Sequence, residues 1–358
     1  MNKALKNKEQ IFLTLEKNSG QKATDIAKML GISRVSVYMH LKKLMEEGRV
    51  NRTGQARASR YFIVDRVLQT QEVIPEIQKL LYEKYEETIS VEAILDTFRR
   101  YMMYIDENGI ISYGLDAFVL WCHDIGHDYS SMIPEKAVEY IDLIGSTEYL
   151  RGKNGFLDVT MPARKILGED MKVGFDRFFI CMISVLSHDF GSTRTALSLR
   201  YGKKNSNSEL LRDAVSPWIL PIRDFANKNH IDAVIFTPPT EGRRVQFRDI
   251  LEQELHLTLS KIIVEKLPLS GRVLEPQKSI RDKKQRIHNA LGSMVVTTIP
   301  SNLLTLSHIL ILDDSFTTGA TPNAIALKLR EAGYKGKITV ITICGSFNYD
   351  LAITEDEI

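Results

Sequence analysis

The sequence of 358 residues predicts three parts with different folds. They are a small α+β domain over residues 1–66, a mainly helical middle region over residues 67–175, and an α/β domain with a parallel sheet over residues 176–358. Three observations predict this order. A helix–turn–helix pattern and two β-prone runs fill the first part, and amphipathic runs fill the second. In the third, short apolar runs alternate with helical segments, which is typical of a parallel sheet.

Charge is distributed unevenly along the chain. Residues 1–66 hold 14 Lys/Arg and 6 Asp/Glu, a net charge of +8, whereas the rest holds 33 and 39, a net charge of −6. A basic domain on a mildly acidic body indicates that the first part meets a polyanion such as nucleic acid.

The apolar runs are too short to predict a transmembrane helix, and the basic start lacks the apolar core and cleavage site of a signal peptide. Cys122, Cys181 and Cys344 lie far apart in apolar stretches. The sequence therefore predicts a cytoplasmic protein with buried thiols, without a disulfide framework, a zinc site or a membrane partner.

The first part predicts helices over residues 8–18, 21–30 and 34–47, with Gly31 as a left-handed C-cap and Ser33 as an N-cap. Two β-prone runs, residues 49–52 and 59–64, then predict a hairpin. The apolar side chains expected to face the core are Ile11, Leu13, Leu15, Ile26, Ala27, Leu30, Val37, Leu41 and Leu44.

The stretch ATDIAKMLGISRVSVYMHLKKLMEEGRVNR resembles the winged helix-turn-helix of bacterial regulators. The resemblance implies that the third helix enters the major groove and that the wing meets phosphates or the minor groove. It implies DNA as the partner, bound by a homodimer. The alternative is a protein-binding module with a solvated basic face. The side chains expected to meet DNA are Ser33, Arg34, Ser36, Tyr38, His40, Lys42, Arg52, Arg57 and Arg60.

In the third part, apolar runs predict strands and the segments between them predict helices. The expected strands are residues 231–237, 260–265, 308–312 and 337–344, and the expected helices are residues 248–257 and 322–332. The third strand ends at Asp313, and ligands of such sheets bind at the carboxyl ends of strands.

The segment ILILDDSFTTGAT therefore has a readable chemistry. Its loop of hydroxyls and backbone N–H groups precedes a helix N-terminus, which favours a phosphate. Gly319 allows the backbone to approach closely. The carboxylates of Asp313 and Asp314 suit the vicinal hydroxyls of a ribose, directly or through Mg²⁺. Together they indicate a ribose-phosphate site.

The same segment resembles the motif of type I phosphoribosyltransferases that binds phosphoribosyl pyrophosphate (PRPP). In that family the two acids contact the ribose hydroxyls and the T-T-G-x-T loop holds the 5-phosphate, with Mg²⁺ accompanying PRPP. The resemblance implies a phosphoribosyltransferase-type domain. Its PRPP-binding residues would be Asp313, Asp314, Thr317, Thr318, Gly319, Ala320 and Thr321.

Upstream segments extend the resemblance to the ComF-like branch of that family. FTPPTEGRRVQF is similar to its first loop, EPQKSIRDKKQRIHNA to its later hood segment, and RYGKKNSNSELL to its lead-in helix. The cations that would face pyrophosphate in an electrostatic mechanism are Arg243, Arg244, Lys283, Lys284 and Arg286.

The middle region contains WCHDIGHDYS, which resembles the H-D-I-G-[KH] element of HD phosphohydrolases. That family needs another upstream His and a downstream Asp, and the sequence offers no suitable upstream His. We interpret His123, Asp124 and His127 as a helix end and predict no metal site. SHDFGS at residues 187–192 is interpreted in the same way, after a helix FFICMISVL.

Two functions follow from these resemblances. The first is a DNA-binding regulator that responds to PRPP or a nucleotide, similar to purine-operon repressors that pair these two fold types. The second is an active phosphoribosyltransferase that acts on a base or nucleic acid. Proteins of this layout also resemble phage-defence effectors encoded beside retron reverse transcriptases, whose partners would be that enzyme and its DNA–RNA product.

Overall fold

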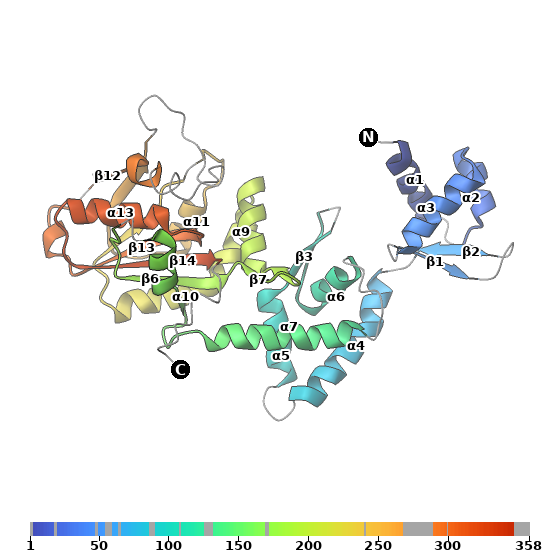
Figure 1. Ribbon diagram of the computed structural model, residues 1–358, viewed down its shortest axis with the longest axis horizontal. Helices are drawn as coiled ribbons and strands as arrows, with labels where there is room; N and C mark the ends of the chain where they lie inside the picture. The colour runs from blue at the N-terminus through green and yellow to red at the C-terminus, as the bar shows by residue number, and fades with distance from the viewer. Residues whose placement is uncertain are drawn as a thin grey trace. The chain divides into compact units, whose positions relative to one another are not determined.

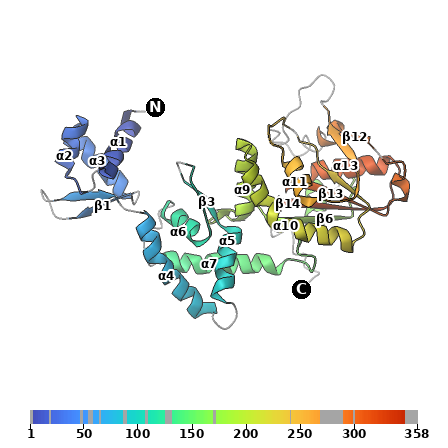
Figure 2. The same ribbon diagram turned by 180° about the vertical axis from the view of Figure 1, so that it is seen from behind.

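The computed structural model describes residues 3–17, 20–46, 49–53, 59–63, 66–85, 90–106, 109–124, 132–168, 172–239, 241–267, 289–298 and 300–346. The chain divides into two compact units, Met1–Asp142 and Leu143–Ile358. Both are visible in Figure 1, and Figure 2 shows them from behind.

The first unit begins with three helices and a two-stranded ribbon, as the sequence predicts for a winged helix. The apolar core that they enclose includes Ile11, Ile26, Val37, Leu41 and Leu44. The elements are α1 (Lys3–Lys17), α2 (Ala23–Leu30), α3 (Arg34–Glu46) and the antiparallel strands β1 (Val50–Thr53) and β2 (Arg60–Ile63).

The turn between α2 and α3 has the predicted caps. Gly31 ends α2 in the left-handed region with φ 63°, where glycine has no Cβ penalty. The Ser33 hydroxyl accepts a hydrogen bond from the Ser36 backbone N–H at 3.1 Å, which satisfies a donor at the start of α3.

Two side chains of this domain differ from the prediction. Leu13 is 45% exposed, because residues i and i+4 of a helix share a face and Ile11 and Leu15 take the inner one. His40 is buried, with 6% exposed, since it lies three positions after Val37 on the core face of α3. The prediction that His40 belongs to the exposed face is therefore wrong.

The rest of the first unit is mainly helical. Phe98, Phe118 and Tyr140 are buried against one another, with ring centroids 5.2 and 5.3 Å apart. The sequence did not predict the short hairpin β3–β4. The elements are α4 (Arg66–Tyr85), α5 (Val91–Tyr101), β3 (Met103–Ile105), β4 (Ile111–Tyr113), α6 (Gly114–Asp124) and α7 (Met132–Tyr149), whose last residues belong to the second unit.

The second unit is built on a six-stranded sheet, in the order β10-β9-β13-β14-β6-β5. All neighbouring strands are parallel except β5, which runs antiparallel to β6. The strands are β5 (Leu157–Asp158), β6 (Arg177–Ile183), β9 (Ala233–Phe236), β10 (Ser260–Lys261), β13 (His308–Phe316) and β14 (Lys337–Gly345).

Helices cover both faces of this sheet. Helix α13 lies on one face, and α10 and α11 lie on the other (Figures 1 and 2). This follows from right-handed crossovers, because β9 to β10 and β13 to β14 step in opposite directions along the sheet. The helices are α8 (Thr160–Leu167), α9 (Arg194–Asn205), α10 (Ser208–Lys228), α11 (Phe247–Leu255) and α13 (Ala320–Glu331).

The remaining elements lie outside the sheet. They are the ribbons β7 (Val185–Ser187) with β8 (Gly191–Ser192) and β11 (Ile263–Lys266) with β12 (Met294–Thr298), and the short helix η2 (Leu303–Thr305). The thiols of Cys122, Cys181 and Cys344 are buried, as predicted. Within the described ranges, no helix has the length and apolar character needed to cross a membrane.

The run FFICMISVL, predicted as a helix, forms strand β6 and enters β7 instead. The prediction was wrong because a short continuous apolar run suits a buried parallel strand as well as a buried helix. The predicted strand 260–265 is split between β10 in the sheet and β11 in a separate ribbon. Residues 157–167, which belong to the region predicted to be mainly helical, contain the strand β5 as well as the helix α8.

Candidate functional site

Strand β13 is longer than predicted, so its two acidic residues lie within it. The strand continues to Phe316, so Asp313 and Asp314 belong to it and do not follow it. Parallel pairing with β14 explains this, because Asp313 pairs with Thr342 and Phe316 with Gly345. The following helix also begins earlier, at Ala320, with Gly319 as its N-cap.

A cavity of about 310 Å³ opens at this edge of the sheet. Its walls come from three places: the end of β13 with the start of α13, the loop after β9 with the start of α11, and α9. The residues that line it are Lys203, Thr237, Pro238, Pro239, Glu241, Arg243, Val245, Gln246, Phe247, Arg248, Asp313, Asp314, Ser315, Thr317, Thr318, Gly319, Ala320, Thr321 and Pro322.

The structure therefore brings together every residue that the sequence assigned to the ribose and the 5-phosphate. Asp313, Asp314, Thr317, Thr318, Gly319, Ala320 and Thr321 all line the same cavity. They do so because only the short loop of residues 317–319 separates the end of β13 from the start of α13.

Asp313 is oriented by a neighbouring strand. The Thr237 hydroxyl, just after β9, donates to the Asp313 carboxylate at 2.6 Å. The Thr237 backbone N–H donates to the Leu312 carbonyl at 3.0 Å, which holds the two strand ends together. Asp313 also accepts from the Asp314 backbone N–H at 2.8 Å. One carboxylate oxygen is therefore fixed by the protein.

Asp314 is paired with a cation that the sequence analysis did not assign to the site. The Lys203 ammonium of α9 forms an ion pair with the Asp314 carboxylate and lies 5.5 Å from the centre of the Phe247 ring. The Ser315 hydroxyl donates to the same carboxylate at 2.6 Å. Lys203 falls in RYGKKNSNSELL, so its segment was noted, but no spacing rule linked it to β13.

The structure describes two of the predicted pyrophosphate-facing cations, and one of these two is at the cavity. Arg243 lines it and forms an ion pair with Glu241, which lines it too. Arg244 is exposed and is not among the lining residues. Lys283, Lys284 and Arg286 lie outside the described residues. Arg248 of α11, not predicted, adds a cation to the wall.

The loop before α13 depends on a glycine in the left-handed backbone region. Gly319 has φ 70°, and an added Cβ would lie 3.2 Å from Phe178 and 3.4 Å from Phe316. The Ala320 backbone N–H donates a hydrogen bond to the Thr318 hydroxyl at 3.3 Å. Glycine is thus required both for the backbone conformation and for the close packing against two rings.

The carboxylates fit Mg²⁺ only in partnership with a ligand. Asp313 and Asp314 stand side by side at the cavity, but among the described residues no three Asp, Glu, His or Cys side chains gather as a metal site. Mg²⁺ is commonly held by one or two carboxylates together with oxygens of a phosphate substrate. The donor set matches that mode of binding.

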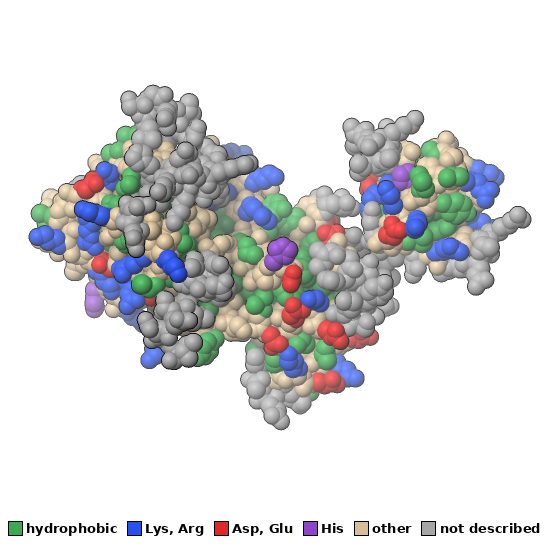
Figure 3. Space-filling model, in the orientation of Figure 1, with side chains coloured by type: hydrophobic (Ala, Val, Ile, Leu, Met, Phe, Trp, Pro, Cys, Tyr) green, Lys and Arg blue, Asp and Glu red, His purple; other side chains and the backbone are tan. Residues whose placement is uncertain are grey.

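The surface predicted to meet DNA is partly as expected. Ser33, just before α3, is exposed, as are Arg34, Tyr38 and Lys42 on α3, and Ser36 is half-buried. In Figure 3, Lys and Arg side chains border hydrophobic ones on this domain. His40 faces the core, and burial is the largest cause that lowers its pKa below the usual value.

The wing arginines have local partners as well as exposure. Arg52 donates from Nε to the Ser59 hydroxyl at 3.0 Å, and Arg60 donates to the Gly20 carbonyl at 2.9 Å. Both side chains therefore help to fix the wing. Arg57 lies outside the described residues.

The two His-Asp segments of the chain lie in different surroundings. His123 is buried and Asp124 is the last residue of α6, while His127 lies outside the described residues. His188 and Asp189 lie exposed on the turn between β7 and β8. The second segment thus follows a strand, and its interpretation as a helix end was wrong.

Comparison with known proteins gives one family match. Residues 6–66 match the family described as the sugar-specific transcriptional regulator TrmB. No curated protein matches the chain. The match covers the three helices and the β1–β2 wing, and it identifies this part as a winged-helix domain of the kind found in transcriptional regulators.

Proposed function

We propose that the chain is a DNA-binding transcriptional regulator whose C-terminal domain binds PRPP or a related ribose phosphate. The observation that carries the ligand half of this proposal is the single cavity that holds Asp313, Asp314 and the whole Thr317–Thr321 loop. The family match at residues 6–66 and the net charge of +8 on residues 1–66 support the DNA half.

The proposed pose uses three groups of contacts. The 5-phosphate lies over the Thr317–Thr321 loop, where threonine hydroxyls, backbone N–H groups and the N-terminus of α13 favour an anion. The ribose hydroxyls lie against Asp313 and Asp314. A pyrophosphate, with Mg²⁺, points toward Arg243 and Arg248 on the facing wall.

Two cations of the cavity are paired with carboxylates of the same cavity, Lys203 with Asp314 and Arg243 with Glu241. PRPP would compete with these carboxylates for the cations whether it is sensed or turned over. We place sensing first because it gives the ligand site and the DNA-binding domain one common role. Regulation then requires that ligand binding change the affinity for DNA, and the same coupling requires that DNA change the affinity for the ligand.

Calorimetric titration of PRPP with Mg²⁺ into the full chain tests the ligand half, with pyrophosphate release followed in the same samples. We expect binding by the wild type and loss of binding in the double variant Asp313→Asn, Asp314→Asn. The matched control is Asp224→Asn, which removes an exposed carboxylate on α10 that pairs with Lys228. Binding that the double variant retains would contradict the site.

Steady release of pyrophosphate would favour the second function, an active phosphoribosyltransferase. Binding without release would favour the sensor. DNA binding by the full chain, measured with and without PRPP, then tests the coupling. An affinity for DNA that PRPP leaves unchanged would contradict the regulatory proposal.

A further inference from the structure

The exposed face of α3 carries apolar side chains in its first half. Val35 is 70% exposed, Met39 is 58% exposed and Tyr38 is 43% exposed. Val35 and Met39 are four positions apart, so they lie on one face of the helix, one above the other. The core side of the same helix is filled by Val37, Leu41 and Leu44, whose side chains are fully buried, so the outer pair plays no part in that core.

Cations flank this apolar pair along the helix. Arg34 begins the helix, and Lys42 and Lys43 follow one turn after Met39; all three are exposed. Such an arrangement suits a nucleic acid better than a protein, because the centres of protein interfaces are depleted of lysine. The cations are suited to contact phosphates, and the apolar pair is suited to contact the bases between those phosphates.

In helix-turn-helix domains, the N-terminal residues of the recognition helix contact the base edges in the major groove. Val35 and Met39 occupy that half of α3. The major-groove edge of a base offers one apolar group in ordinary DNA, the C5 methyl of thymine. Neither side chain can donate a hydrogen bond to a base edge, so neither can read the guanine or adenine edge in the way that Arg or Asn does.

We propose that Val35 and Met39 read thymine methyl groups, so that the DNA site of this chain is specified at those positions by methyl contact. The inference rests on the proposed DNA-binding function and extends it to the class of sequence recognised. Arg34 and Tyr38, which alternate with the apolar pair, supply polar contacts to the same half-site.

The test starts with a DNA site selected by the full chain from a random pool. Each thymine of that site is then replaced by deoxyuridine, which lacks only the C5 methyl. Loss of one contacted methyl should raise the Kd of the wild type about fourfold. Burial of a group of this size contributes roughly 0.8 kcal/mol, and about 1.4 kcal/mol corresponds to a tenfold change in Kd.

In Met39→Ala, replacing the thymine that Met39 contacts by deoxyuridine should no longer change the Kd. In Val35→Ser, the same should hold for the thymine that Val35 contacts. The control variant is Leu13→Gln, which changes an exposed apolar residue of α1 and should keep the full thymine dependence. Unchanged thermal unfolding of the variants would show that each is folded, which the exposure of these side chains leads us to expect.

Sequence-specific binding that deoxyuridine leaves unchanged at every position would overturn the inference and leave the DNA-binding function standing. Failure to bind any DNA would overturn both. Loss of self-association in Met39→Ala, with unaltered thymine dependence, would assign the apolar pair to contact between two copies of the chain and would also overturn the inference.

Discussion

Lys203 and Asp314 form an ion pair inside the cavity at the end of β13 although they are 111 positions apart in the sequence. Both side chains are largely shielded, with 15% and 26% exposed. The contact links α9 to the end of β13 and places a cation beside the carboxylate expected to meet a ribose. A lysine of the cavity wall therefore comes from a helix that lies more than 100 residues before Asp313 and Asp314 in the sequence.

Replacing Lys203 should weaken ligand binding. In Lys203→Gln the anionic ligand loses one nearby cation, and Asp314 loses its counter-ion, so we expect the Kd for PRPP to rise about tenfold, the lower end of what one charged hydrogen bond contributes. Calorimetry measures the change. The control is Lys204→Gln, the exposed neighbour on α9, and an equal loss in both variants would argue against a specific role for Lys203.

Gly319→Ala should distort the loop that we propose holds the 5-phosphate. A residue with a Cβ at φ 70° costs about 1–2 kcal/mol, and the added methyl would press on Phe178 and Phe316. We expect lower thermal stability and no measurable PRPP binding. Gly242→Ala is the matched control, because a Cβ there meets nothing within 4 Å, and its binding should equal that of wild type.

The sequence predicted those parts of the site that are contiguous. Asp313 to Thr321 form one strand–loop–helix unit, so local chemistry was enough to group them in one cavity. Lys203, Thr237 and Arg248 reach the cavity through the order of strands in the sheet, which no local pattern encodes. Their contribution could not be predicted without the tertiary structure.

The errors of prediction have similar causes. FFICMISVL is apolar except for Ser184 and carries no period, so its strand could not be distinguished from a helix. His40 was assigned to the exposed face for its polarity, although its spacing from Val37 places it on the core side of α3. The fold of FFICMISVL depends on pairing with a distant strand, whereas the burial of His40 follows from local spacing that the prediction did not use.

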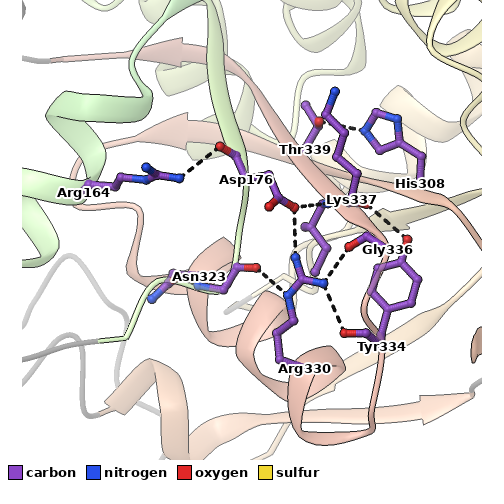
Figure 4. Close-up of polar contacts among 11 residues, drawn as sticks. Arg164, Asp176, His308, Asn323, Arg330, Tyr334, Gly336, Lys337 and Thr339 are labelled. Atoms are coloured by element: carbon purple, nitrogen blue, oxygen red, sulfur yellow. Dashed lines mark hydrogen bonds and ion pairs between the residues drawn. The ribbon is translucent and has the colours of Figure 1, made fainter.

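Arg330 should be a major contributor to the stability of the second unit. Its guanidinium donates to the carbonyls of Gly174, Tyr334 and Gly336 at 3.0, 3.1 and 2.6 Å, and to the Asp176 carboxylate at 2.9 Å (Figure 4). Asp176 in turn accepts from the Ile338 backbone N–H at 2.7 Å, at the start of β14. One side chain of α13 thus holds the segments that lead into β6 and β14.

In Arg330→Lys we expect the unfolding free energy to fall by about 2 kcal/mol, because an ammonium cannot reproduce a planar fork and leaves carbonyls without donors. Urea unfolding followed by Trp218, which is buried in this unit, measures the change in a Trp121→Phe background. Lys328→Gln, which removes a more exposed ion pair with Glu331 on the same helix, should cost far less. A similar loss in both would refute this role.

His308 should make the second unit less stable in acid. The ring is buried between the Asn229 carbonyl at 3.1 Å and the Thr339 hydroxyl at 2.8 Å, and burial is the main cause that lowers its pKa below the usual 6.5. The unfolded chain then binds a proton at a higher pH than the folded chain does. Stability is therefore full above about pH 6.5 and falls as the pH drops from there toward the folded pKa.

The measurement is urea unfolding followed by Trp218 in the same background between pH 7.5 and pH 5. Among the described residues, the other buried histidine with a lowered pKa is His40, which lies in the first unit. His308→Gln should be less stable at pH 7.5, because it loses the fitted ring, yet its stability should fall less on acidification. His188→Gln, which removes an exposed ring, should keep the wild-type slope. If His308→Gln keeps that slope as well, the acid sensitivity belongs to other groups, because a glutamine side chain binds no proton in this range.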